Sequence, residues 1–209
     1  MKRHIHSTTL LAAIIALGLQ TPAARAQEHG ETPQASAATR TANTHVAERL
    51  PLADRGDFDA AERGLIARDP ALVIKDSDGQ PIWDITAYDF IEGDAPATVN
   101  PSLWRQAKLN DLHGLYKVTD RVYQLRGYDL SNMSLIEGDS GWIVVDPLTT
   151  AETAAAAWQM AKAHIIGDKP IVAVIFTHSH IDHFGGIEGV LSPEQARRDN
   201  VRIIAPKGF

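Results

Sequence analysis

The stretch that decides the fold is THSHIDHFGG, residues 177–186. Four potential metal ligands fall within six positions of it: His178, His180, Asp182 and His183. An apolar run, residues 171–176, precedes the cluster, and a Gly-Gly pair follows it. This pattern is typical of a buried strand that opens into a loop at its C-terminal end. Because sites in open α/β sheets usually lie at this edge, the sequence predicts a metal site here.

The spacing of the four residues indicates how they divide. Side chains two positions apart on an extended chain point to the same side, so His178 and His180 can bind one ion. Asp182 and His183 follow where the chain turns and can face a second ion. Imidazoles with one carboxylate suit zinc, with iron or manganese as alternatives. Two such ions about 3.5–4 Å apart could activate a water, and Asp182 is also our candidate catalytic residue. The alternative, a His-rich surface loop or core histidines, explains the pattern less well.

Asp146 follows an apolar segment, residues 142–145, and has two interpretations. It could cap a loop or helix at the end of a strand. It could instead accept a hydrogen bond from a ligand histidine and fix the orientation of its ring.

The N-terminus predicts export. Lys2 and Arg3 precede an apolar run, residues 10–19, and Ala24-Arg25-Ala26 supplies a cleavage site. Residues 1–26 are therefore expected to be a secretory signal peptide and not a membrane span, with an uncleaved anchor as the alternative. The mature protein is expected in a periplasm or secreted. Residues 27–49 hold almost no large apolar side chain and are expected to be a flexible leader.

Composition excludes some classes of partner. The 209 residues carry a net charge of −6, and the predicted signal peptide contains three cations and no acid, so the mature chain would carry −9. An acidic protein is a poor candidate for binding nucleic acid or an anionic membrane. With 44% hydrophobic residues the chain can bury the core of one domain. There is no cysteine, so no thiolate can join the metal site.

The remaining periodicity predicts a mixed α/β sheet. Helices are expected near residues 57–68, 101–112 and 152–166, and strands near residues 115–118, 122–125, 133–137, 142–145, 171–176 and 201–205. The early strands read as hairpins and the later ones alternate with helices, so antiparallel and parallel pairing are both expected. Gly138-Asp139-Ser140-Gly141 mimics the nucleophile motif of serine proteases, but a tight hairpin turn explains it fully.

Residues 177–183 look like the metal-ligand motif of the metallo-β-lactamase fold. Segments outside that motif make the resemblance closer, and these are similar to the alkyl sulfatases of that superfamily, which include dodecyl sulfate hydrolases: residues 50–54, 57–58, 98–106, 110–119 and 132–148. The resemblance implies an αββα sandwich. Residues 50–209 would be only the N-terminal portion of this domain, since members of the family are much longer.

The resemblance also implies an activity. These enzymes hydrolyse a small-molecule alkyl sulfate ester to an alcohol and inorganic sulfate, with two zinc ions, a metal-activated water and attack on carbon. By resemblance His178 and His180 would hold one zinc, Asp182 and His183 the other, and Asp146 would support the metal loop. A homodimer is expected for the family but not for this chain, which is expected to be inactive alone. Two alternatives stay open: another hydrolase of this fold, acting on a lactam, lactone or thioester, and a non-catalytic truncated product.

Overall fold

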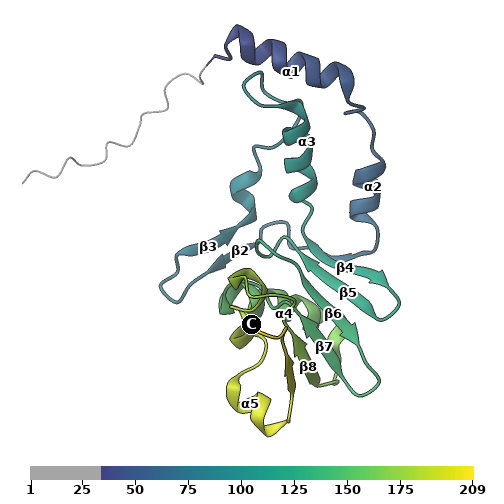
Figure 1. Cartoon of the computed structure of the whole chain (residues 1–209), viewed down its shortest axis with the longest axis vertical. Helices are drawn as coiled ribbons and strands as arrows, with labels where there is room; N and C mark the ends of the chain where they lie inside the picture. Colours follow the sequence, from purple (N-terminus) through teal and green to yellow (C-terminus); the bar gives the residue numbers. More distant parts are fainter. Residues whose placement is uncertain (1–33) are drawn as a thin grey trace, which may run out of the picture. The chain divides into compact units, whose positions relative to one another are not determined.

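The computed structural model describes residues 34–209 (Figure 1). The helices are α1 (Ala37–Arg49), α2 (Gly56–Glu62), α3 (Pro101–Asn110), α4 (Ala151–Ala161) and α5 (Pro193–Arg198). Short helical turns are η1 (Ile85–Tyr88), η2 (Lys162–Ile166), η3 (Ile181–His183) and η4 (Ile187–Gly189). Within these residues no helix is long and apolar enough to cross a membrane.

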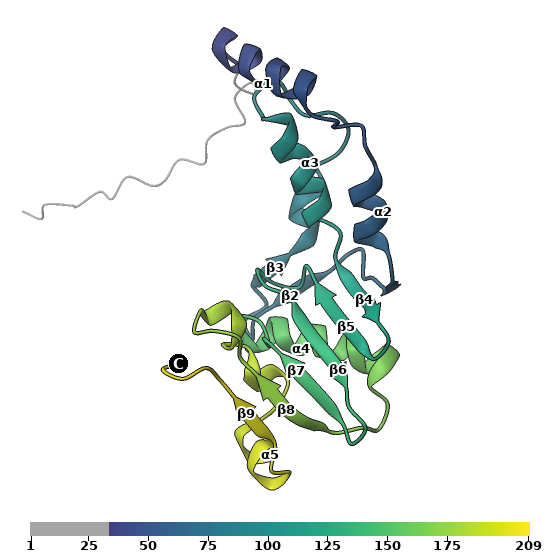
Figure 2. The same cartoon turned by 45° about the vertical axis from the view of Figure 1, so that its right-hand side comes forward.

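The main sheet has seven strands in the order β1-β4-β5-β6-β7-β8-β9, and helices α1, α2 and α3 extend away from one end of it (Figure 2). Its strands are β1 (Leu65–Ala67), β4 (Gly114–Thr119), β5 (Val122–Arg126), β6 (Met133–Glu137), β7 (Trp142–Val145), β8 (Ile171–Ile175) and β9 (Arg202–Ile204). Neighbours pair antiparallel from β1 to β7 and parallel from β7 to β9. A separate hairpin joins β2 (Val73–Lys75) to β3 (Pro81–Asp84). The expected mixed sheet is confirmed.

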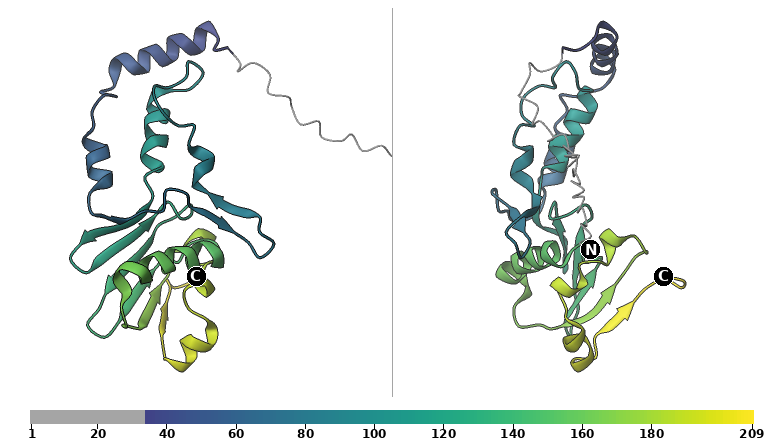
Figure 3. Two further views of the ribbon diagram at one scale, coloured as in Figure 1. Left: turned by 180° about the vertical axis from the view of Figure 1, so that it is seen from behind. Right: turned by 90° about the vertical axis from the view of Figure 1, so that its left-hand side faces the viewer.

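Helix α4 covers one face of this sheet (Figure 3). It begins with a capping box at Thr150 and presents the buried alanines Ala154, Ala157 and Ala161, whose small side chains let a helix lie close to its neighbours. Trp142 and Val144 of β7 are buried in the same core. The indole N–H of Trp142 donates to the carbonyl of Ile166, 3.0 Å away, which ties the end of the helical segment to the sheet.

The alternate side chains of β6 and β7 form a second apolar surface. Ile136 and Ile143 pair across the two strands, and Val145 follows on the same side of β7. These three residues are only partly buried, whereas Leu135 and Val144, which pair on the side of the core, are fully buried. The sheet is therefore apolar on both faces, as in a layered sandwich.

Two expected elements differ from the structure. The helix expected over residues 57–68 ends at Glu62, and Leu65–Ala67 pair with β4 instead. Gly64 makes this turn with φ +78°, and a Cβ there would lie 2.1 Å from the carbonyl oxygen of Lys117, so the backbones approach more closely than a helix would allow.

Residues 37–49, expected to be part of a flexible leader, form helix α1 instead. Ser36 caps the helix by accepting from the N–H of Thr39, and the side-chain amide of Asn43 donates to the carbonyls of Ala97 and Val99. No residue of α1 is buried, so the low apolar content indicated an exposed segment and not an unstructured one. Residues 27–33 of that leader and the predicted signal peptide, residues 1–26, lie outside the described residues.

Candidate metal centre

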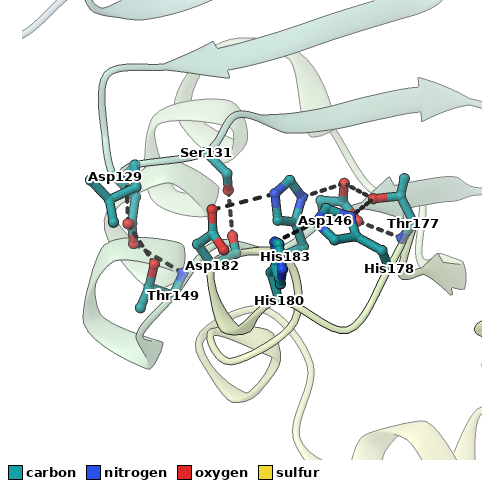
Figure 4. Close-up of polar contacts among 10 residues, drawn as sticks. Asp129, Ser131, Asp146, Thr149, Thr177, His178, His180, Asp182 and His183 are labelled. Carbon is teal, nitrogen blue, oxygen red and sulfur yellow. Dashed lines mark hydrogen bonds and ion pairs between the residues drawn. The ribbon is translucent and has the colours of Figure 1, made fainter. Parts of the chain in front are cut away.

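The predicted metal loop begins at the edge of the sheet where parallel strands β7 and β8 both end. Val145 pairs with Ile175, so the residues that follow the two strands come side by side. The N–H of Asp146 donates to the carbonyl of Ile175 at 3.0 Å, and the N–H of Thr177 donates to Oδ1 of Asp146 at 2.8 Å. Parallel pairing thus brings Asp146 to the start of the metal loop (Figure 4).

Asp146 is buried and accepts two further hydrogen bonds at Oδ2. One comes from the hydroxyl of Thr177 at 2.7 Å and the other from Nδ1 of His183 at 2.8 Å. Because a carboxylate only accepts, Nδ1 of His183 carries a proton, and in the neutral imidazole the lone pair then lies on Nε2. The hydrogen bond to a predicted ligand histidine is therefore present.

The same carboxylate also sets the protonation of His178, through Thr177. The Thr177 hydroxyl uses its proton on Asp146, so it accepts at its other contact, 3.0 Å from Nδ1 of His178. His178 then carries its proton on Nδ1 and presents the lone pair of Nε2. One buried carboxylate thus places the Nδ1 protons of two imidazoles, which in their neutral form bind a metal through Nε2.

The four predicted ligands form two pairs. Nε2 of His178 lies 3.1 Å from Nδ1 of His180, and Nε2 of His183 lies 3.3 Å from Oδ2 of Asp182. The rings of His178 and His183 are also close, with centroids 4.1 Å apart. Two donor atoms bound to one tetrahedral zinc at about 2.0–2.2 Å would be separated by roughly 3.3 Å, so both spacings are compatible with a shared ion as well as with a direct polar contact.

Within residues 34–209, however, no group of three or more His, Asp or Glu side chains is arranged to hold a metal ion. Structural and catalytic zinc sites take at least three protein ligands. The residues present therefore match zinc in donor type, and each pair by itself would be only part of a coordination shell.

The glycines that follow the cluster are required by close packing. A Cβ on Gly185 would lie 2.3 Å from the carbonyl oxygen of Thr149, and one on Gly186 would lie 2.2 Å from that of Pro147. The N–H of Gly186 donates to the carbonyl of Leu148 at 2.9 Å. The metal loop is thus held directly against the segment that enters helix α4.

A polar loop between β5 and β6, residues 127–132, was not predicted to take part in the site. Its Asp129 is buried and accepts from the N–H and hydroxyl of Thr149 and from the hydroxyl of Thr153. The hydroxyl of Ser131 donates to the main-chain carbonyl of Asp182. Four hydrogen-bonding side chains precede β6 in sequence, but nothing local indicates partners 20 to 51 positions away.

A cavity of about 510 Å³ is lined in part by this loop. Its apolar wall includes Trp83, Ile85 and Leu112, and Arg126 and Asn132 add polar groups. Tyr128, in the same loop, is buried, which raises the pKa of its phenol to about 12, with Asp69 adding to the shift. Its hydroxyl has no hydrogen-bond partner within the described part of the chain.

Comparisons with known proteins identify related sequences. The family model described as the metallo-beta-lactamase superfamily matches residues 126–208, which contain the whole candidate site. An (R)-specific secondary-alkylsulfatase from Pseudomonas sp is 48% identical over 213 residues, covering 100% of this chain and 32% of that protein. A linear primary-alkylsulfatase from Pseudomonas sp is 46% identical over 202 residues, covering 96% of this chain and 29% of that protein.

Solved structures give the same result. The structure of the stereoselective inverting sec-alkylsulfatase Pisa1 from Pseudomonas sp. matches with a TM-score of 0.78 and 50% identity, covering 85% of this chain and 28% of that one. The chain spans about a third of the length of the curated relatives it matches. It is therefore related to the alkylsulfatases and has part of the metallo-β-lactamase fold.

Proposed function

We propose that this protein hydrolyses alkyl sulfate esters to an alcohol and inorganic sulfate. The observation that carries the proposal is the identity of 48% to a secondary-alkylsulfatase across the whole chain, including the loop with its paired ligands. Relatives named for both secondary and primary substrates match at similar identity. The proposed substrate class is therefore alkyl sulfates in general.

We propose zinc as the metal, with His178 and His180 as ligands of one ion and Asp182 and His183 as ligands of a second. Zinc, when bound, would supply a Lewis acid and a water with a pKa lowered toward neutrality. The chain itself holds the Nδ1 protons of His178 and His183, the first through Thr177 and the second directly on Asp146. This network leaves Nε2 as the nitrogen through which each neutral ring would bind an ion.

Asp182 is the proposed catalytic carboxylate. Its side chain is partly exposed and lies 3.3 Å from Nε2 of His183, at the end of the network that begins at Asp146. The carboxylate adds negative charge beside the three histidine side chains of the metal loop. It would therefore favour a divalent cation and, next to it, the polarisation of a bound water.

We propose further that the 209-residue chain is inactive by itself, because each pair supplies two ligands where zinc sites take three or more from protein. Export to a periplasm or the medium is proposed from the N-terminal pattern of Lys2, Arg3 and Ala24-Arg25-Ala26. A homodimer is proposed for the whole protein by its relation to the alkylsulfatases.

The test is sulfate release from a panel of primary and secondary alkyl sulfates by the protein purified from its native source. We expect release that a chelator abolishes and added Zn²⁺ restores. A protein that releases sulfate from no alkyl sulfate, but opens a lactam, a lactone or a thioester, would refute the proposal and support a different hydrolase of this fold.

A further inference from the structure

We infer that Asp129 and Ser131 are positioning residues that hold Asp182 in place from the opposite side to Asp146. The inference rests on the proposed metal centre, since it concerns the placement of one of its ligands. Loop residues 127–132, between β5 and β6, form a bracket that connects the first turn of helix α4 to the metal loop (Figure 4).

The first arm of this bracket is Asp129. Its side chain is 7% exposed, and its two oxygens accept from three groups of helix α4 and the residues before it. Oδ1 accepts from the Thr149 hydroxyl at 2.6 Å, and Oδ2 accepts from the Thr149 N–H at 3.0 Å and the Thr153 hydroxyl at 2.5 Å. A buried carboxylate with all of these donors can take only one position, so it fixes the loop to the helix.

The second arm is Ser131. It is 8% exposed, and its hydroxyl donates to the main-chain carbonyl of Asp182. The nearby N–H of Gly185 donates to the carbonyl of Ile181 instead. The orientation of the Asp182 peptide group is therefore set from outside the loop, by Ser131.

The contacts of Asp129 and Ser131 together link helix α4, the loop 127–132 and the metal loop into one continuous set of contacts. Gly185 packs against the carbonyl oxygen of Thr149, and Thr149 is held by Asp129. Asp129 continues through the loop to Ser131, and Ser131 returns to Asp182, three residues before Gly185. Without the Ser131 hydroxyl, the carbonyl of Asp182 loses its donor and can rotate toward water. The carboxylate would then leave its position 3.3 Å from Nε2 of His183.

The experiment compares two single variants of the whole protein as it is produced in its native source. Ser131→Ala removes the hydroxyl that contacts Asp182. Ser134→Ala is the matched control, because the Ser134 hydroxyl lies on β6 and accepts from Gln124 at 3.3 Å, without a contact to the metal loop. Zinc affinity is measured by competition with a chelating dye. Hydrogen exchange of the Phe184 and Gly185 amides, which donate to Ile181, reports the order of the loop without metal.

We expect Ser131→Ala to bind zinc about tenfold more weakly, as is typical when a group that orients a ligand is removed. The Phe184 and Gly185 amides should exchange about fivefold faster, the loss of roughly one hydrogen bond, while the Val144 amide in the core keeps its rate. Ser134→Ala should match the unaltered chain in all three measurements. Asp129→Asn should weaken zinc binding by a similar factor, because its amide adds a donor where only donors surround it.

Equal zinc affinity and equal loop exchange in Ser131→Ala and the unaltered chain would overturn the inference. An equal loss in Ser134→Ala would also overturn it, because the effect would then be general destabilisation. Neither readout uses a sulfate ester. A chain that binds zinc and shows the Ser131 effect but comes from a protein without sulfatase activity would contradict the proposed function and leave this inference standing.

Discussion

Asp146→Asn is the substitution that most sharply tests the network around the metal loop. The amide has the size of the carboxylate, but one oxygen becomes an NH₂ group. If NH₂ replaces Oδ1, it faces the N–H of Thr177, and two donors meet at 2.8 Å. If it replaces Oδ2, it faces Nδ1 of His183 and the Thr177 hydroxyl, and His183 must move its proton to Nε2. The first placement brings two donors together, and the second forces His183 into the wrong tautomer, so both should destabilise the site.

The size of the effect follows from burial. Asp146 is 7% exposed, so a donor left without an acceptor costs about 1–3 kcal/mol. For a chain of this size that corresponds to a fall in Tm of roughly 2–4 °C for each kcal/mol. Moving the proton of His183 to Nε2 removes the lone pair that would bind the ion, and changes of this kind cost about 10–100-fold in metal affinity.

The assay is urea denaturation of the metal-free chain together with zinc competition. Asp139→Asn is the control, because the Asp139 side chain is 97% exposed and forms only an ion pair with Arg121. Exposed pairs contribute about 0–1 kcal/mol, so this variant should behave like the unaltered chain. If Asp146→Asn kept both its stability and its zinc affinity, the assignment of the two histidine protons would be wrong.

Three further predictions follow from single positions. Gly186→Ala should destabilise the chain by about 1–3 kcal/mol in urea denaturation, because its Cβ would lie 2.2 Å from the Pro147 carbonyl oxygen; wild-type stability would contradict the close packing described here. His180→Ala should lose zinc binding by dialysis and keep its circular dichroism spectrum, whereas His164→Ala, on an exposed turn, should bind zinc normally; the reverse result would remove His180 from the site. Tyr128 keeps its proton in the folded chain up to about pH 12 while the unfolded chain ionises from pH 10, so stability should fall between these values by up to roughly 2–3 kcal/mol. Tyr128→Phe should abolish this fall and cost little at pH 7, since the hydroxyl has no partner in the described residues; an unchanged pH profile would assign the fall to another group.

The metal loop could be predicted from sequence because its information is local. A strand, four candidate ligands and two glycines follow one another within residues 171–186. The role of each can be inferred from its residue type and spacing, without knowing which distant residue it contacts. The hydrogen bond between Asp146 and a ligand histidine was predictable for a similar reason, because neighbouring parallel strands have their C-terminal ends at the same edge of the sheet. The pairing of β7 with β8 places it there.

Other features depend on distant contacts and were not predictable. Asp129 and Ser131 acquire a role only when α4 and the metal loop fold onto them. Strand β1 has three residues, and its apolar pair, Leu65 and Ile66, also fits one face of a helix. Helix α1 buries no residue and has few apolar side chains, so no periodicity reveals it.

The measurement that tests the central claim most directly is the release of sulfate from dodecyl sulfate by the native protein in ¹⁸O-labelled water. We predict release that stops with a chelator and label in the alcohol, since the related alkyl sulfatases are expected to direct water to carbon. Absence of sulfate release, or release that a chelator leaves unchanged, would contradict the proposal that this protein is a metal-dependent alkyl sulfatase.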